Sequence, residues 1–263
     1  GHAHLHFVMN GSVGAVFSYL ERDPISYRQK VDLDASKAQG NAQINLLIDF
    51  PTLADMAVED VNVKATAKLT DLVVPGAVKG LTLSGPAFDL DASENHFKLA
   101  GAGKLETQPA KVSWEEYFEP QPGAEYASKL EASIQTDKPI RQKFIAALED
   151  RVDGIIPADI SLVTRPDGVA KLDVTAVLND ARIDFTNPFN AVKEKGAPAT
   201  AKLAGTLRNG DIVSIDSLSI TGSGMSLASG NLAFGRDAKN EAILSKAVLK
   251  GLKLGENNAS MEA

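Results

Sequence analysis

The 263-residue chain contains no cysteine, only four histidines and only 6% aromatic residues. The lack of cysteine excludes disulfides, thiol catalysis and cysteine-ligated metal sites. No apolar run approaches the roughly 18 residues that a membrane-spanning helix needs, and no signal peptide is recognisable. The net charge of -7 is spread along the chain, and no basic stripe is present to contact phosphates. We therefore expect no nucleic-acid partner.

Apolar and polar residues alternate in several segments, which is typical of β-strands with one apolar face. The clearest segments are 41–50, 61–69, 169–178 and 199–207. In the first of them, the apolar positions are Ala42, Ile44, Leu46, Ile48 and Phe50. The recurrence of this pattern predicts a mainly β fold.

Short turn motifs separate these segments. Proline and glycine in 165–168 favour a tight turn, and Asn209-Gly210 is a strong hairpin signal. Further turns are expected at 93–95 and 235–240, and the glycine-rich stretch 222–230 predicts a bulge or a turn. The strands should therefore follow one another as an antiparallel meander.

Only two segments have helical periodicity. The first begins after a possible cap at Ser12 and should end at Asp23-Pro24. The second should begin at a cap, Asp137, and end near Gly154. Its predicted apolar stripe comprises Ile140, Phe144, Leu148 and Val152.

Each predicted helix is followed by several strands, which suggests two related units. We place them at 1–119 and 124–263, because two prolines and a glycine interrupt both patterns at 119–123. The expected fold class is β-rich α+β, with strongly curved, meandering antiparallel sheet and about two short helices. The sheet could be groove-like or sandwich-like, and the two units could share one continuous sheet.

Three histidines alternate along 2–6, which is how several zinc sites begin. His2, His4 and His6 would share one face of a strand with neighbours about 6.5–7 Å apart, so two adjacent ones could bind one ion. The only other histidine is His96, and no further ligand motif is present. We therefore predict no metal site, and a solvent-facing role for these histidines beside the apolar alternate positions Ala3, Leu5, Phe7 and Met9.

Signatures of catalysis and of cofactor binding are also missing. There is no G-x-S-x-G elbow, and the stretch 222–230 lacks the lysine of a phosphate-binding loop. Glu115 and Glu116 lie beside aromatic residues, which could raise a pKa, but solvated glutamates at a strand end are the expected arrangement. We predict no catalytic residue, no cofactor and no enzyme activity.

The alternating strands expose more apolar surface than two helices can cover. The cover could be a second sheet, the helices with loops, or a bound apolar ligand, and sheet packing is the default. If a lipid is the cover, the contacts should come collectively from Ile44, Leu46, Ile48, Val61, Val63, Leu69, Leu172, Val174, Leu203 and Leu207.

Several stretches resemble the repeat-rich C-terminal region of AsmA-like envelope proteins, most closely the YhdP-type and TamB-type members. They are LHFVMNGSVGAVFSYLERDPISY (5–27), GNAQINLLIDFP (40–51), VNVKATAKLTDLVVPG (61–76), AKVSWEEYF (110–118) and the stretch 177–207. The resemblance covers nearly the whole chain and rests on strand and turn patterns.

This resemblance implies a periplasmic segment of a longer protein that an N-terminal helix anchors in the inner membrane. Family members are thought to carry phospholipid acyl chains to the outer membrane along an apolar β-groove, without catalysis. The alternative is a closed β-sandwich that serves as a structural or protein-binding domain of the cell envelope.

Overall fold

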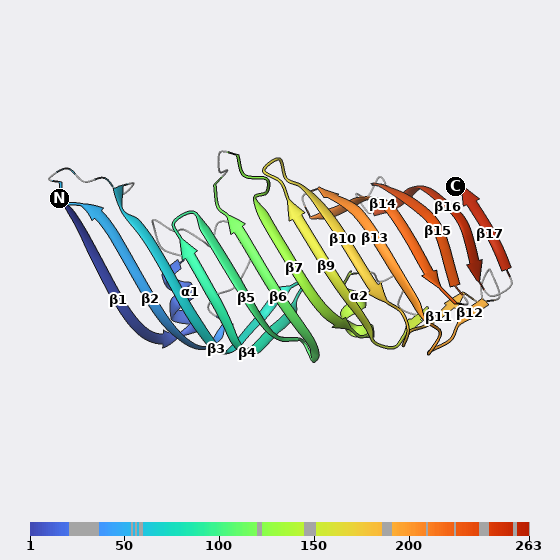
Figure 1. Cartoon of the computed structure of the whole chain (residues 1–263), viewed down its shortest axis with the longest axis horizontal. Coiled ribbons are helices and arrows are strands. Elements are labelled where there is room, and N and C mark those ends of the chain that lie inside the picture. The colour runs from blue at the N-terminus through green and yellow to red at the C-terminus, as the bar shows by residue number, and fades with distance from the viewer. Residues whose placement is uncertain are drawn as a thin grey trace. The chain divides into compact units, whose positions relative to one another are not determined.

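The structure is a computed structural model that describes residues 1–20, 37–53, 55, 57, 60–119, 123–144, 151–185, 191–208, 210–223, 225–236, 242–254 and 257–262. It has two compact units, Gly1–Ser128 and Lys129–Ala263. Strands dominate both units, so the predicted mainly β fold is confirmed (Figure 1).

The first unit is an antiparallel meander of six strands with one helix. Its elements are β1 (His2–Ser12), α1 (Val13–Leu20), β2 (Gln39–Pro51), β3 (Asn62–Val78), β4 (Leu81–Ser93), β5 (His96–Leu105) and β6 (Gln108–Tyr117). The strands lie side by side in chain order from β1 to β6. Among the described residues of this unit, β1 is the edge of the sheet.

The second unit has a large and a small sheet. Its elements are β7 (Ser128–Thr136, of which all but the first residue belong to this unit), α2 (Lys138–Phe144), β8 (Val152–Asp153), β9 (Ile156–Thr164), β10 (Val169–Val177), β11 (Arg182–Phe185), β12 (Ala191–Lys193), β13 (Ala199–Arg208), β14 (Asp211–Gly222), β15 (Met225–Arg236), β16 (Ala242–Leu254) and β17 (Asn257–Glu262). The large sheet has the order β7-β9-β10-β13-β14-β15-β16-β17, and the small sheet β12-β11-β8.

The turn motifs lie where the sequence predicts them. In the β9–β10 turn, the Gly168 N–H donates to the Arg165 carbonyl at 3.0 Å. Residues 94–95 connect β4 to β5, Gly210 lies between β13 and β14, and β14 ends at Gly222 before β15 begins at Met225. Asn209, Gly224 and residues 237–240 of the predicted turns lie outside the described residues.

Both predicted helix caps are confirmed. The Ser12 hydroxyl accepts a hydrogen bond from the Ala15 N–H at 3.2 Å, and the Asp137 carboxylate accepts one from the Ile140 N–H at 3.1 Å. These side chains satisfy N–H groups that have no partner within the helix. The predicted stop at Asp23-Pro24 lies outside the described residues.

The predicted end of the second helix is wrong. Val152 belongs to β8 and pairs with Ile183 of β11, and Gly154 lies just before β9 with a φ of 98°. Phe144, predicted on the apolar stripe, is largely exposed, whereas Ile140 is fully buried. Leu148 lies outside the described residues. Strand pairing with a distant segment therefore overrides the helical period of this stretch.

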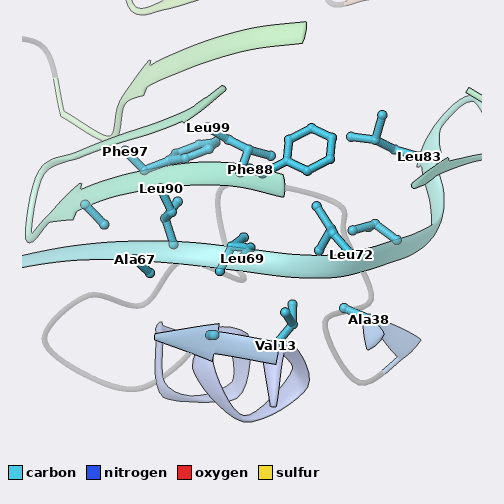
Figure 2. Close-up of a cluster of buried hydrophobic side chains, with 13 residues drawn as sticks. Val13, Ala38, Ala67, Leu69, Leu72, Leu83, Phe88, Leu90, Phe97 and Leu99 are labelled. Atoms are coloured by element: carbon cyan, nitrogen blue, oxygen red, sulfur yellow. The ribbon is translucent and has the colours of Figure 1, made fainter. Parts of the chain in front are cut away.

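Each unit has its own buried core. In the first unit, Val13 at the start of α1 packs with Leu69 and Leu72 of β3, and Phe88 of β4 belongs to the same cluster (Figure 2). In the second unit, Val152 and Ile183 of the small sheet pack with residues of the large sheet such as Met225 and Leu227. Helix α1 and the small sheet thus cover part of one sheet face in their respective units.

Candidate functional site

One face of the first unit's sheet is mostly apolar on all six strands. Leu5, Phe7 and Met9 of β1 pair with Ile48, Leu46 and Ile44 of β2, and Ile48 pairs in turn with Val63 of β3. Directly opposed residues of antiparallel strands point to the same side. We call the side that carries these residues the apolar face of the first unit.

Helix α1 covers only part of this face. Val13 and Val16 pack against the cluster around Leu69, which is 1% exposed. Towards the β1 edge, Leu5, Phe7 and Met9 are 40–42% exposed. A row of three large apolar side chains on β1 is therefore partly exposed to solvent beside a buried core.

The large sheet of the second unit has a corresponding apolar face. Val174 of β10 pairs with Leu203 of β13, which pairs with Leu218 of β14, and Leu207 pairs with Ile212. The small sheet covers one part of this face around Ala199 and Met225. Leu172, Val174, Leu203 and Leu207 remain only half-buried.

The ten residues predicted to face a lipid differ in their access to the surface. Those that are half-buried are Ile44, Ile48, Val61, Leu172, Val174, Leu203 and Leu207. Leu46 and Val63 are buried, although they lie on the same face of the sheet as the exposed residues of β1. Leu69 is 1% exposed in the core cluster that also contains Val13 of α1 and Phe88 of β4, so it has no access to a lipid in this structure. The more accessible Leu5, Phe7 and Met9 were not among the predicted contacts, although their alternation along β1 placed them on the apolar side.

The opposite face of β1 and β2 is mostly polar, with Val8 and Leu47 as exposed apolar residues. His4 Nδ1 lies 3.1 Å and His2 Nδ1 3.7 Å from the two carboxylate oxygens of Asp49, and the two imidazole rings stack at 6.4 Å. These histidines and His6 are largely exposed. In the part of the chain that the structure describes, no three His, Asp or Glu side chains are grouped to hold a metal ion.

Glu115 is not the solvated side chain that the sequence predicts. It is 19% exposed, and its carboxylate lies 3.1 Å from His96 Nε2 and 3.4 Å from Lys98 Nζ. Burial alone would raise the pKa of Glu115, but the hydrogen bond with His96 and the charge of Lys98 bring it below the usual value.

Glu116 lies on the other side of the sheet, opposite Phe97. It is also partly buried rather than solvated, and burial raises the pKa of its carboxyl despite a side-chain hydrogen bond with Trp114. The expectation failed for both glutamates because β5 supplies the neighbours of the β6 side chains, and local sequence does not reveal that pairing.

A buried lysine lies in the small sheet of the second unit. Lys193 is 2% exposed, and its ammonium donates to the carbonyls of Ala181 at 2.9 Å and Glu194 at 3.1 Å. Burial lowers the pKa of Lys193. Because both contacts are to main-chain carbonyls, this lysine links the residue before β11 to the residue after β12, and nothing in its local sequence indicates this role.

Comparison of the chain with known protein families, with curated proteins and with solved structures finds no match. Among the described helices, neither is long and apolar enough to cross a membrane.

Proposed function

We propose that this chain is a non-enzymatic, periplasmic segment of an AsmA-like envelope protein whose apolar sheet faces bind phospholipid acyl chains in transit between the inner and outer membranes. The observation that carries the proposal is the exposed row of Leu5, Phe7 and Met9 on the apolar face of the first unit. The resemblance of the strand and turn stretches to AsmA-like proteins is the basis for the proposed location in the envelope and for the proposed phospholipid ligand.

Binding of this kind needs no specific polar site. Removing apolar surface from water is worth about 0.8 kcal/mol per methylene, so an acyl chain gains several kcal/mol from a continuous apolar surface. The exposed row on β1 adjoins the half-buried Ile44 and Ile48 on β2, which makes the surface continuous across two strands. A surface that binds weakly along its whole length suits a ligand that must move.

The alternative, a closed sandwich, has one supporting observation in the second unit. There the small sheet packs on part of the large sheet's apolar face. In the first unit, the described residues contain a single sheet with α1 on its apolar face. We therefore prefer acyl-chain binding to a closed sandwich. Substitutions on β1 are the best test of this preference.

The test compares two charged substitutions on the same strand. Phe7→Asp introduces a carboxylate into the exposed apolar row, and Val8→Asp introduces one at a residue that is 60% exposed on the opposite face. We expect Phe7→Asp to reduce binding of a fluorescent phospholipid several-fold and Val8→Asp to leave it unchanged, with circular dichroism showing that both variants fold. Equal binding by wild type and Phe7→Asp, or no binding by wild type, would reject the proposal.

Co-purification offers a second test. Organic extraction of the purified protein followed by mass spectrometry should detect phospholipid bound to wild type, and less of it bound to Phe7→Asp. In a full-length parent protein, charged replacements of Ile44 and Ile48 should block lipid passage. Normal passage with correctly folded variants would contradict the transport role.

A further inference from the structure

Glu116 is the one ionisable residue among the positions that the strand register places on the apolar face of the first unit. That face includes Ala3, Leu5, Phe7, Met9, Ala42, Ile44, Leu46, Ile48, Phe50, Val63, Ala65, Ala67, Leu69, Phe88, Leu90, Ala92, Phe97, Leu99, Val112 and Trp114. A carboxyl group in such surroundings costs solvation free energy. A function of Glu116 in ligand binding would explain why a carboxyl group lies on this face.

Aromatic rings surround the position of Glu116. It lies directly opposite Phe97 and two residues along the chain from Trp114 and from Phe118. The Phe97 ring meets the Trp114 ring edge-on at 4.7 Å and the Phe118 ring in a stacked arrangement at 6.0 Å. Aromatic rings beside a carboxylate favour a cation through both the ring quadrupole and the negative charge.

The neighbouring glutamate has the cationic partners that Glu116 lacks. Glu115, on the opposite face, contacts both Lys98 and His96. Glu116 has a side-chain hydrogen bond with Trp114, and no ion pair within the described part of the chain. An incoming cation would therefore not have to displace a lysine or arginine of the described residues.

We propose that Glu116 binds the ammonium headgroup of an amphiphile whose acyl chain lies along the half-buried Val112 and Trp114 of β6, on the apolar face of the first unit. This inference rests on the proposed function and specifies its ligand class: amphiphiles with an ammonium group, in preference to those with only an anionic head. A headgroup at this face meets a carboxylate, and the chain's net charge of -7 adds to the repulsion of an anionic head.

The ligand class can be tested with probes that share one alkyl chain. Decylammonium, decyl maltoside and decyl sulfate differ in headgroup charge and are used below their micelle concentrations. Trp114 is the chain's only tryptophan, so its fluorescence reports directly on the proposed site. We expect wild type to bind decylammonium about tenfold more tightly than decyl maltoside, which corresponds to about 1.4 kcal/mol.

Three variants separate the headgroup contact from effects on folding. Glu116→Gln keeps the side-chain shape and should lose the tenfold preference while still binding decyl maltoside, whereas Glu116→Asp should keep part of it. Glu115→Gln, on the opposite face, should keep all of it. A preference for decylammonium that survives in Glu116→Gln would overturn the inference.

The outcome for wild type distinguishes failure of this inference from failure of the proposed function. If all three probes bind with equal affinity, the apolar face binds chains but Glu116 does not select the headgroup, and only this inference is lost. If no probe changes the fluorescence of Trp114, the face beside β6 binds no chain and this inference is lost, whereas binding of the fluorescent phospholipid to wild type and Phe7→Asp decides the proposed function separately.

Discussion

The main chain of Gly40 lies so close to Thr70 that a Cβ added to the glycine would be 2.6 Å from the Thr70 carbonyl oxygen. Gly40 also has a φ of 120°, an angle that residues with a side chain rarely adopt. At the same place, the β2–β3 register shifts between Gln39 and Asn41. Opposite this shift, Asp71 has a φ of 53°. The resulting bulge changes the alternation along β3, so that both Leu69 and Leu72 are buried.

Replacing Gly40 with alanine should therefore destabilise the first unit. Because both the close main-chain contact and the backbone angle oppose a side chain, we expect a loss of about 3 kcal/mol in the free energy of unfolding, measured with urea. Gly11→Ala is the matched control, since an added Cβ there meets no atom within 4 Å. Equal stability of the two variants would show that the bulge does not require glycine.

Leu69 and Leu47 provide a test of which leucines form the core. Leu69→Ala should cost about 3 kcal/mol, because the side chain is fully enclosed and its removal leaves a cavity. Leu47→Ala removes a half-exposed side chain from the polar face of β2 and should change stability by less than about 0.5 kcal/mol. A small effect of Leu69→Ala would restore that residue as a candidate for lipid contact.

Local patterns were sufficient to predict several of the strands and most turns. The alternation in 41–50 matches the burial of Ala42 and Leu46 in β2, because a strand with one covered face has a period of two residues. The turn at 165–168 forms because proline and glycine favour its backbone angles locally.

Features that depend on distant partners were not predictable in this way. Val152 joins β8 because Ile183 pairs with it, and Leu69 is enclosed because α1 packs on its face and Phe88 of the paired strand β4 lies beside it. The same alternation occurs on covered and uncovered parts of a sheet face. The exposed row on β1 was consequently recognisable only once the position of α1 was known.

Asp216 should make the second unit less stable in acid. Hydrogen bonds from Ser214, Thr206 and Lys171 lower the pKa of its carboxyl from 3.8 to about 2. The Asp216 carboxyl therefore binds a proton more readily in the unfolded chain than in the folded chain. The stability that the ionised carboxylate contributes is present above pH 4 and is lost as the pH falls towards 2.

We expect Asp216→Asn to lose about 1 kcal/mol or less at pH 7, since the carboxylate is 42% exposed and solvent screens it. The difference from wild type should vanish near pH 2, measured by urea unfolding across this range. Asp89→Asn is a suitable control, because Lys68 is the one ion-pair partner of Asp89 among the described residues and the pair is exposed. A difference that stays constant from pH 7 to pH 2 would contradict the assigned role of the carboxylate.

Arg141 links the start of α2 to the strands that follow it. Its Nη1 donates to the carbonyls of Thr136 at 2.6 Å and Gly154 at 2.8 Å, and its Nη2 donates to the Val152 carbonyl at 3.0 Å. A planar guanidinium can reach several carbonyls at once, which a lysine ammonium on a flexible stem does less well. Arg141 thereby joins the end of β7 to β8 and to the turn before β9.

Arg141→Met should leave three partly buried carbonyls without this donor and cost about 3 kcal/mol, and Arg141→Lys should recover only part of the loss. Hydrogen exchange should show reduced protection at β8 and β9 and unchanged protection at β1–β6, which belong to the other unit. Lys143→Met, at an exposed position in the last turn of the same helix, should have little effect. If Arg141→Lys matched wild type, a positive charge alone would be sufficient here, and the link from the end of β7 to β8 and the turn before β9 would not depend on the forked geometry of arginine.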